Sequence, residues 1–314
     1  LLASPGQMAF FHGAFIGLTI FIVGQGVQKG IERAVKFLMP ALFFLLLVLV
    51  GYAAIEGDFG GAVAFLFQAD FSKIDANVLL SAIGQAFFSV SVAMGLLISY
   101  GSYLNKEINI TRAAIIIAGA DTLVALLAGL AIFPLVFANG LDAAEGPGLL
   151  FVTLPIAFGN MPAGALFGTV FFALILVSAV TSSIAGFEPI VAWADEHRGM
   201  KRGRSALIIG IAAWLVGLLT VFSFNLWGDF YPLDAFESFK GKSMFDLLAY
   251  FTNDLMLPLG GALLAIFAGW VMSSDNTREE LGLPDGPVYA IWLLLVRYLC
   301  PVAVGAVFLA YLFG

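Results

Sequence analysis

Four acidic residues lie inside long apolar runs of the sequence and could take part in ion or proton chemistry. They are Asp121, Glu188, Asp246 and Asp254. A carboxylate at membrane depth is costly unless it is paired, so each is a candidate functional group. For Glu188, Asp246 and Asp254 we favour a structural role, in which the partner is a Lys, an Arg or a backbone group of a neighbouring helix.

Asp121 favours a different partner. It lies in "AGADTLVALLAG", while nearly all Lys and Arg residues lie in hydrophilic segments between the apolar runs. A bound cation would compensate the carboxylate, and the oxygen ligands that suit other hard cations also suit Na⁺. We therefore expect Asp121 to bind sodium.

Two further stretches place small and hydroxyl residues at the same depth. One is "SAVTSSIAG" at 178–186, and the other is "GQAFFSVSVAMGLLISYGSY" at 84–103. Small residues also allow ordinary close helix packing, so neither stretch is decisive alone. With Asp121, however, three neighbouring apolar runs contain polar or small residues at membrane depth. This combination indicates a cavity lined by these residues.

The 84–103 stretch allows two structures. It can be one continuous helix whose serines bond back to the preceding turn. It can also be a helix interrupted at glycine and serine, with freed backbone groups that meet protein, ligand or water. The periodicity leaves both open.

The composition shows what kind of element must hold these residues. Hydrophobic residues make up 61% of the 314 and charged residues 11%, whereas a soluble domain has about 25% charged residues. This predicts an all-α integral membrane protein in a lipid bilayer. The single cysteine excludes an internal disulfide, the two histidines leave no zinc motif, and no basic surface suggests nucleic acid.

Apolar runs of about 20 residues predict eight transmembrane helices. They are 8–24, 35–54, 78–103, 112–138, 161–194, 205–223, 244–272 and 287–313. Ten of the 14 Lys and Arg residues follow the first, third, fifth and seventh spans, which places those loops in the cytoplasm. The loops at about 55–77, 139–160 and 224–243 are then extracellular. Both ends of the chain fall outside, so we expect an odd number of helices before residue 1.

The sequences of several segments resemble those of the neurotransmitter:sodium symporter family, and within it those of the bacterial amino-acid transporters. The segments are "GQAFFSVSVAMG", "DTLVALLAG", "GPGLLFVTLPIAF", "SAVTSSIAGFEP" and "MFDLLAYF", in this order. The resemblance covers essentially the whole chain and implies the LeuT fold. Residues 8–24 match the fourth helix of the family and 287–313 its eleventh. Residues 1–314 would then form one transporter domain without the first three family helices.

The resemblance implies a break in the 78–103 helix around Ser89–Val92. Phe88 would cover the substrate, backbone near Phe88–Ser91 would meet its amino group, and Met94 would line its side-chain pocket. The implied substrate residues are Phe88, Ser89, Ser91, Met94, Ser182 and Gly186. The implied ligands of two sodium ions are Ser89 and Asp121 for one site, and Ser178 (through its carbonyl), Thr181 and Ser182 for the other.

Two departures from the family pattern sharpen this expectation. Ala125 stands where chloride-dependent members have a serine, and Asp121 stands where many members have an asparagine. A fixed carboxylate beside Na⁺ would replace the charge of chloride, so we expect chloride-independent transport. Methionine is adaptable and glycine leaves volume open, so Met94 and Gly186 favour a large hydrophobic or aromatic L-amino acid.

The resemblance also implies two gates. Asp246 matches an outer acidic residue that pairs with an arginine of the missing first helix. Tyr103, with Asp195 or Glu196, matches the cytoplasmic gate, whereas Asp254 has no implied role.

The expected function is sodium-coupled amino-acid symport by alternating access in a bacterial plasma membrane. The oligomeric state is left open. Two alternatives remain: a proton- or sodium-coupled carrier of another LeuT-fold family, or a non-transporting fragment, because both sodium sites are incomplete without the first helix. An intramembrane enzyme is disfavoured, since no paired catalytic aspartates and no zinc motif are present.

Overall fold

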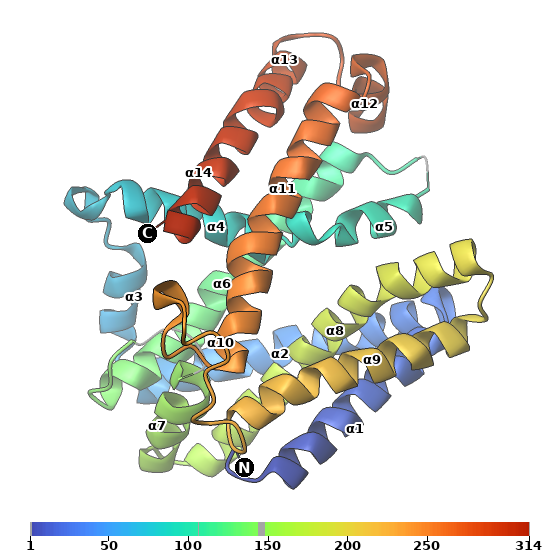
Figure 1. Ribbon diagram of the computed structural model, residues 1–314. Helices are drawn as coiled ribbons and strands as arrows, with labels where there is room; N and C mark the ends of the chain where they lie inside the picture. Colours follow the sequence, from blue (N-terminus) through green and yellow to red (C-terminus); the bar gives the residue numbers. More distant parts are fainter. Residues whose placement is uncertain (1, 106, 144–147, 314) are drawn as a thin grey trace. The chain divides into compact units, whose positions relative to one another are not determined.

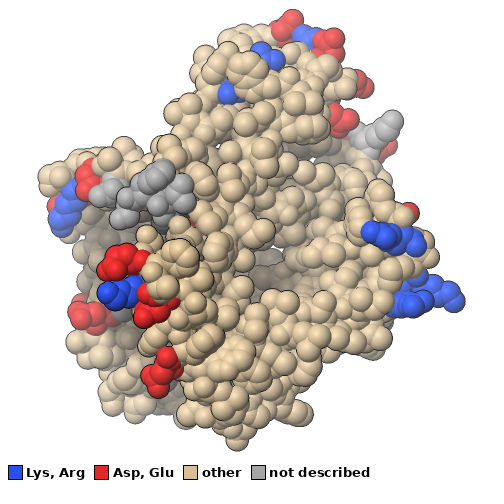
Figure 2. All heavy atoms as spheres, viewed as in Figure 1, with Lys and Arg blue, Asp and Glu red and all other residues tan. Residues whose placement is uncertain are grey.

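A computed structural model describes residues 2–105, 107–143 and 148–313 of the chain (Figure 1). Throughout this part the regular secondary structure is helical, which confirms the all-α prediction. By length and composition, seven of the described helices can cross a membrane. The remaining predicted span, 78–103, is interrupted and falls into shorter helices. On the face shown in Figure 2, most of the surface carries neither basic nor acidic side chains, as expected for a protein surrounded by lipid.

The chain divides into two compact units. The 3₁₀- and π-helical segments are labelled η. Unit 1 comprises Leu1–Gln25, Lys73–Ile117 and Ala185–Gly314. It contains α1 (Pro5–Gly24), α4 (Ala76–Ser89), η3 (Val92–Met94), α5 (Leu96–Ser102), the start of α6 (Ile110–Ala138), the end of α8 (Gly164–Arg198), α9 (Arg202–Ser223), η5 (Glu237–Phe239), α10 (Met244–Ala249), η6 (Tyr250–Met256), α11 (Leu257–Ile266), η7 (Phe267–Val271), α12 (Ser274–Leu281), α13 (Pro287–Leu294), η8 (Leu295–Leu299) and α14 (Cys300–Phe313).

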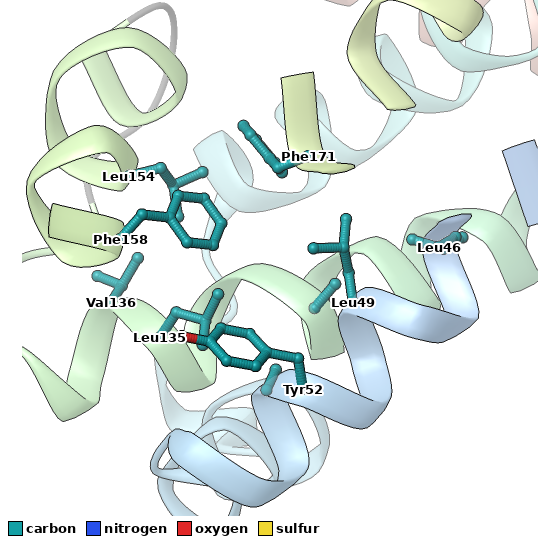
Figure 3. Close-up of a cluster of buried hydrophobic side chains, with 10 residues drawn as sticks. Leu46, Leu49, Tyr52, Leu135, Val136, Leu154, Phe158 and Phe171 are labelled. Atoms are coloured by element: carbon teal, nitrogen blue, oxygen red, sulfur yellow. The ribbon is translucent and has the colours of Figure 1, made fainter. Parts of the chain in front are cut away.

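Unit 2 comprises Gly26–Ser72 and Ala118–Ile184. It contains η1 (Val27–Glu32), α2 (Arg33–Glu56), α3 (Phe59–Phe67), the first two residues of η2 (Phe71–Lys73), most of α6, η4 (Leu149–Thr153), α7 (Leu154–Asn160) and the first part of α8. Its core joins α2, α6, α7 and α8 (Figure 3). The Tyr52 ring stacks on Phe167 with centroids 3.7 Å apart, and its hydroxyl donates to the Pro162 carbonyl at 2.8 Å.

Two of the π-helical segments in the last two spans are each followed by a proline. A proline has no N–H, and its ring crowds the carbonyl four residues earlier. Pro258 follows the π-helical η6 and removes the donor for Asp254, and Pro301 follows the π-helical η8 and removes the donor for Arg297. The wider turns thus lie immediately before each proline.

Arg297 shows how such a freed carbonyl is satisfied. Its carbonyl accepts a hydrogen bond from Nε1 of Trp270 at 3.1 Å, while its own Nε donates to the carbonyl of Gly269. Gly269 lies in the last turn of its helix, where carbonyls lack intrahelical donors. Each helix thus donates a hydrogen bond to a carbonyl of the other helix that lacks an intrahelical donor. This role explains why an arginine occurs inside the last predicted span.

Candidate substrate and ion sites

The helix of residues 78–103 is broken, as the resemblance to the family predicted. α4 ends at Ser89 and α5 begins at Leu96, with the single turn η3 between them. Ser91 has φ 55° and Gly95 has φ 71°, so both residues are left-handed. A left-handed residue cannot continue a right-handed helix, which rules out the continuous alternative. The break extends to Gly95, beyond the predicted Ser89–Val92.

The break exposes both polar backbone and apolar side chains. The amide of Ser91 donates to the Phe88 carbonyl at 3.0 Å, and that of Met94 to the Ser91 carbonyl at 3.3 Å. Within the described residues, no hydrogen bond is donated to the Ala93 carbonyl. Phe88 and Met94 flank the turn with 46% and 48% of their surfaces exposed. Such a turn can offer dipoles to a charged group and apolar surface to a side chain.

The predicted ligands of the second sodium lie together on α8, in unit 2. The Thr181 hydroxyl donates to the Ser178 carbonyl at 2.8 Å and to the Val177 carbonyl at 3.1 Å. Ser182 is one turn beyond Ser178, so both lie on one face of the helix, and both are exposed. This turn presents a carbonyl and two hydroxyls, which are ligands that suit a hard cation.

The other predicted residues are divided between the units. Asp121, on α6, is half-buried in unit 2, and Ala125 is exposed one turn later. The broken helix and Gly186 belong to unit 1. Because the predicted substrate and sodium sites take residues from both units, their assembly stays a prediction.

Glu188 is the centre of a buried polar cluster in unit 1. Its side chain is fully buried, and its Oε1 accepts a hydrogen bond from the Tyr103 hydroxyl at 2.9 Å. Its Oε2 forms an ion pair with Arg202, whose Nε also donates to the Val23 carbonyl at 3.1 Å. Both carboxylate oxygens are paired, as a buried charge requires. The expected structural partner of Glu188 is confirmed.

The same cluster changes the expected cytoplasmic gate. Tyr103 donates to Glu188, not to Asp195 or Glu196. Within the described residues, the side chains of Asp195 and Glu196 form no hydrogen bond or ion pair, so their gate role stays a prediction. Sequence reasoning missed Arg202 because its loop contains several basic residues and nothing distinguished this one.

The last two acidic candidates differ from each other. Asp246 forms a capping box at the start of α10: its Oδ2 accepts from the Ser243 amide at 2.9 Å and from the Ser243 hydroxyl at 2.7 Å. Its partner is therefore the cap of its own helix rather than the expected group of a neighbouring helix, and its gate role stays a prediction. Asp254 lies in η6, and its side chain makes no hydrogen bond or ion pair with the described residues. The charge of Lys242 acts on it without direct contact, so the expected close pairing is not formed within this part of the chain.

Comparison with known proteins identifies the family. The model of the sodium:neurotransmitter symporter family matches residues 2–310. The chain belongs to the sodium:neurotransmitter symporter family. An uncharacterized sodium-dependent transporter of Haemophilus influenzae is 33% identical over 99% of this chain and 66% of its own length. The uncharacterized sodium-dependent transporter YhdH of Bacillus subtilis is 34% identical over 98% of this chain and 68% of its own.

A solved structure of the symporter family supports the fold. The crystal structure of MhsT in complex with L-phenylalanine is 38% identical, with a TM-score of 0.87. The match covers 99% of this chain and 69% of that chain. The predicted membership and the LeuT fold are therefore confirmed, and the chain spans about two thirds of the length of these relatives.

Proposed function

We propose that this symporter-family protein carries a large hydrophobic or aromatic L-amino acid into the cell together with Na⁺. The observation that carries the proposal is the broken helix, with Phe88 and Met94 exposed beside the Ala93 carbonyl, which accepts no hydrogen bond from the part of the chain that the structure describes. Its relative MhsT has been crystallised in complex with L-phenylalanine, an amino acid of the class that Met94 and Gly186 favour. The setting is the bacterial plasma membrane, and no covalent chemistry is involved.

In this proposal the substrate lies at the break in the helix. Backbone groups near Phe88–Ser91 meet the amino group, and Phe88 covers the ligand. Met94 contacts its side chain. On α8, Ser182 contributes a hydroxyl, and Gly186 leaves volume for a large side chain.

Two sodium ions complete the proposed site. Ser89 and Asp121 bind the first, and Ser178, Thr181 and Ser182 bind the second. Because bound Na⁺ and substrate stabilise the same closed arrangement, each raises the affinity of the other by the same factor. Asp246 on the outer side, and Tyr103 with Asp195 or Glu196 on the inner side, act as gates in the alternating-access cycle.

The proposal includes independence from chloride. Asp121 supplies a fixed negative charge beside the first sodium, and the methyl group of Ala125 cannot bind an ion. Uptake should therefore persist when gluconate replaces chloride. A collapse of the rate would refute this part alone.

A pair of threonines on one helix tests the sodium site. Thr181 and Thr169 both lie on α8 and both donate to a backbone carbonyl four residues earlier. Thr181→Val should raise the Na⁺ concentration for half-maximal uptake about tenfold, since a polar contact with a charge contributes about 1.5–3 kcal/mol. Thr169→Val should leave it unchanged. Equal effects of the two variants, or uptake driven by a pH gradient without Na⁺, would contradict the proposal.

A further inference from the structure

The turn at the break in the helix lies directly against α11. Figure 1 shows α11 crossing the junction of α4 and α5, and η3 packs against this helix. The contact is made at Gly260. A Cβ atom there would collide with the carbonyl oxygen of Ala93, and it would lie 3.4 Å from the Ala93 carbonyl carbon. The two backbones therefore meet with no side chain between them.

The contact supports a turn that is strained on one side. Ser91 and Gly95, which flank η3, are both left-handed. Glycine adopts this conformation freely, whereas for Ser91, which has a Cβ, it costs about 1–2 kcal/mol. The Ala93 carbonyl receives no hydrogen bond from the described residues, so the Cα–H of Gly260 is its close neighbour. Strained backbone persists where its surroundings hold it.

The supporting helix is itself firmly packed. Leu257, Pro258 and Gly261 of α11 are buried, and the helix also packs against α14. Because α11 is held in this way, an added side chain at residue 260 would move the turn rather than the helix. Met94, the next residue after Ala93, would move with it.

We propose that Gly260 is a positioning residue for the substrate-binding turn, and that its lack of a side chain sets how large a substrate side chain the protein accepts. This inference rests on the proposed function. A methyl group at residue 260 pushes Ala93 away from α11 and carries Met94 into the space of the substrate. Large amino acids then lose more affinity than small ones.

The test compares Gly260→Ala with Gly305→Ala in the complete gene product. Gly305 lies on α14, next to α11, and a Cβ there meets nothing within 4 Å. We expect faster amide hydrogen exchange in peptides covering 88–99 for Gly260→Ala only. In proteoliposomes, the ratio of phenylalanine to alanine uptake should fall about tenfold, the scale of discrimination by one methylene in an apolar pocket.

The outcomes separate the inference from the proposed function. Unchanged exchange in Gly260→Ala would overturn the positioning role, whether or not the protein transports. Faster exchange with an unchanged ratio would overturn the size effect. Wild-type protein without Na⁺-driven amino-acid uptake would overturn the proposed function and the size effect together, while exchange still decides the positioning role.

A double variant keeps the test decisive if Gly260→Ala is hard to produce. Adding Met94→Ala shortens the side chain that the displaced turn carries. The double variant should regain phenylalanine uptake relative to alanine. If Met94→Ala alone and the double variant show the same ratio as each other and as wild type, the inference is wrong.

Discussion

The broken helix contains no proline, whereas several continuous helices do. Ser91 and Gly95 interrupt the α4–α5 segment, while α8 continues through Pro189 and α6 through Pro134. A proline removes one hydrogen bond, but the rest of the helix keeps its right-handed backbone. Left-handed residues change the direction of the chain. The comparison teaches that backbone handedness, supported by a neighbouring helix, produces the break.

The continuous helices obtain their polar contacts from other parts of the chain. Next to Pro189, the carboxylate of Glu188 is paired by Tyr103 and Arg202. At Pro134, the carbonyl accepts a hydrogen bond from the Asp58 amide at 2.9 Å. The polar groups beside these prolines are thus satisfied, while the Ala93 carbonyl at the break accepts no hydrogen bond from residues 2–105, 107–143 and 148–313. Three substitutions test this difference, and they are given in order of decreasing effect.

Removing the Glu188 carboxylate should have the largest effect. Glu188→Ala leaves Arg202 without its partner in a buried site, which costs about 3–5 kcal/mol. We expect a much lower unfolding temperature in detergent, measured by size-exclusion chromatography after heating. Glu188→Gln, which keeps the shape and can still hydrogen-bond, should cost less. Equal stability of Glu188→Ala and wild type would show that the cluster does not hold α8.

A side chain at Gly95 should have an intermediate effect. Gly95→Ala places a Cβ on a residue with φ 71°, which costs about 1–2 kcal/mol. If the turn binds substrate, affinity should fall about tenfold, since 1.4 kcal/mol corresponds to a factor of ten. The matched control is Gly101→Ala in the regular part of α5, where a Cβ meets nothing within 4 Å. A similar loss in both variants would contradict a special role for the left-handed position.

The smallest effect should come from the hydrogen bond at Arg297. Trp270→Phe keeps an aromatic ring but removes the N–H that reaches the Arg297 carbonyl, so about 1 kcal/mol of stability should be lost. Trp292→Phe in α13 is the control, because its indole N–H makes no hydrogen bond with the described residues. Thermal unfolding of both variants would measure the difference. If the control loses as much, the hydrogen bond is not the cause.

The sequence was most informative where hydrophobicity alone determines structure. Seven predicted spans correspond to helices that begin and end near the expected residues, such as 287–313 and α13–α14. The periodicity of the 84–103 stretch allowed both a continuous and a broken helix. Only the resemblance to the family predicted the break. Its full extent was not predicted. Gly95 can be left-handed because it is a glycine, but nothing in the residue type of Ser91 indicates this conformation, and the contact between Ala93 and Gly260 joins residues far apart in the sequence.

The polar partners were the least predictable part. Tyr103 and Glu188 are 85 residues apart, and Glu188 and Arg202 are 14 apart. The free-energy cost of an unpaired carboxylate inside the membrane indicated that Glu188 needs a partner, but it did not indicate which residue that partner is. Asp246 was expected to pair, yet its observed partner is Ser243 in a helix cap. The membrane environment predicts that a buried carboxylate must be paired, but only the folded structure identifies the partner residue.

The exchange of hydrogen bonds between Trp270, Gly269 and Arg297 also has a mechanical consequence. To slide past one another, the two helices would have to separate two polar contacts where lipid offers no replacement. We therefore expect the two helices to move together, so that a conformational change that tilts α11 at the substrate turn also carries the helix of Arg297.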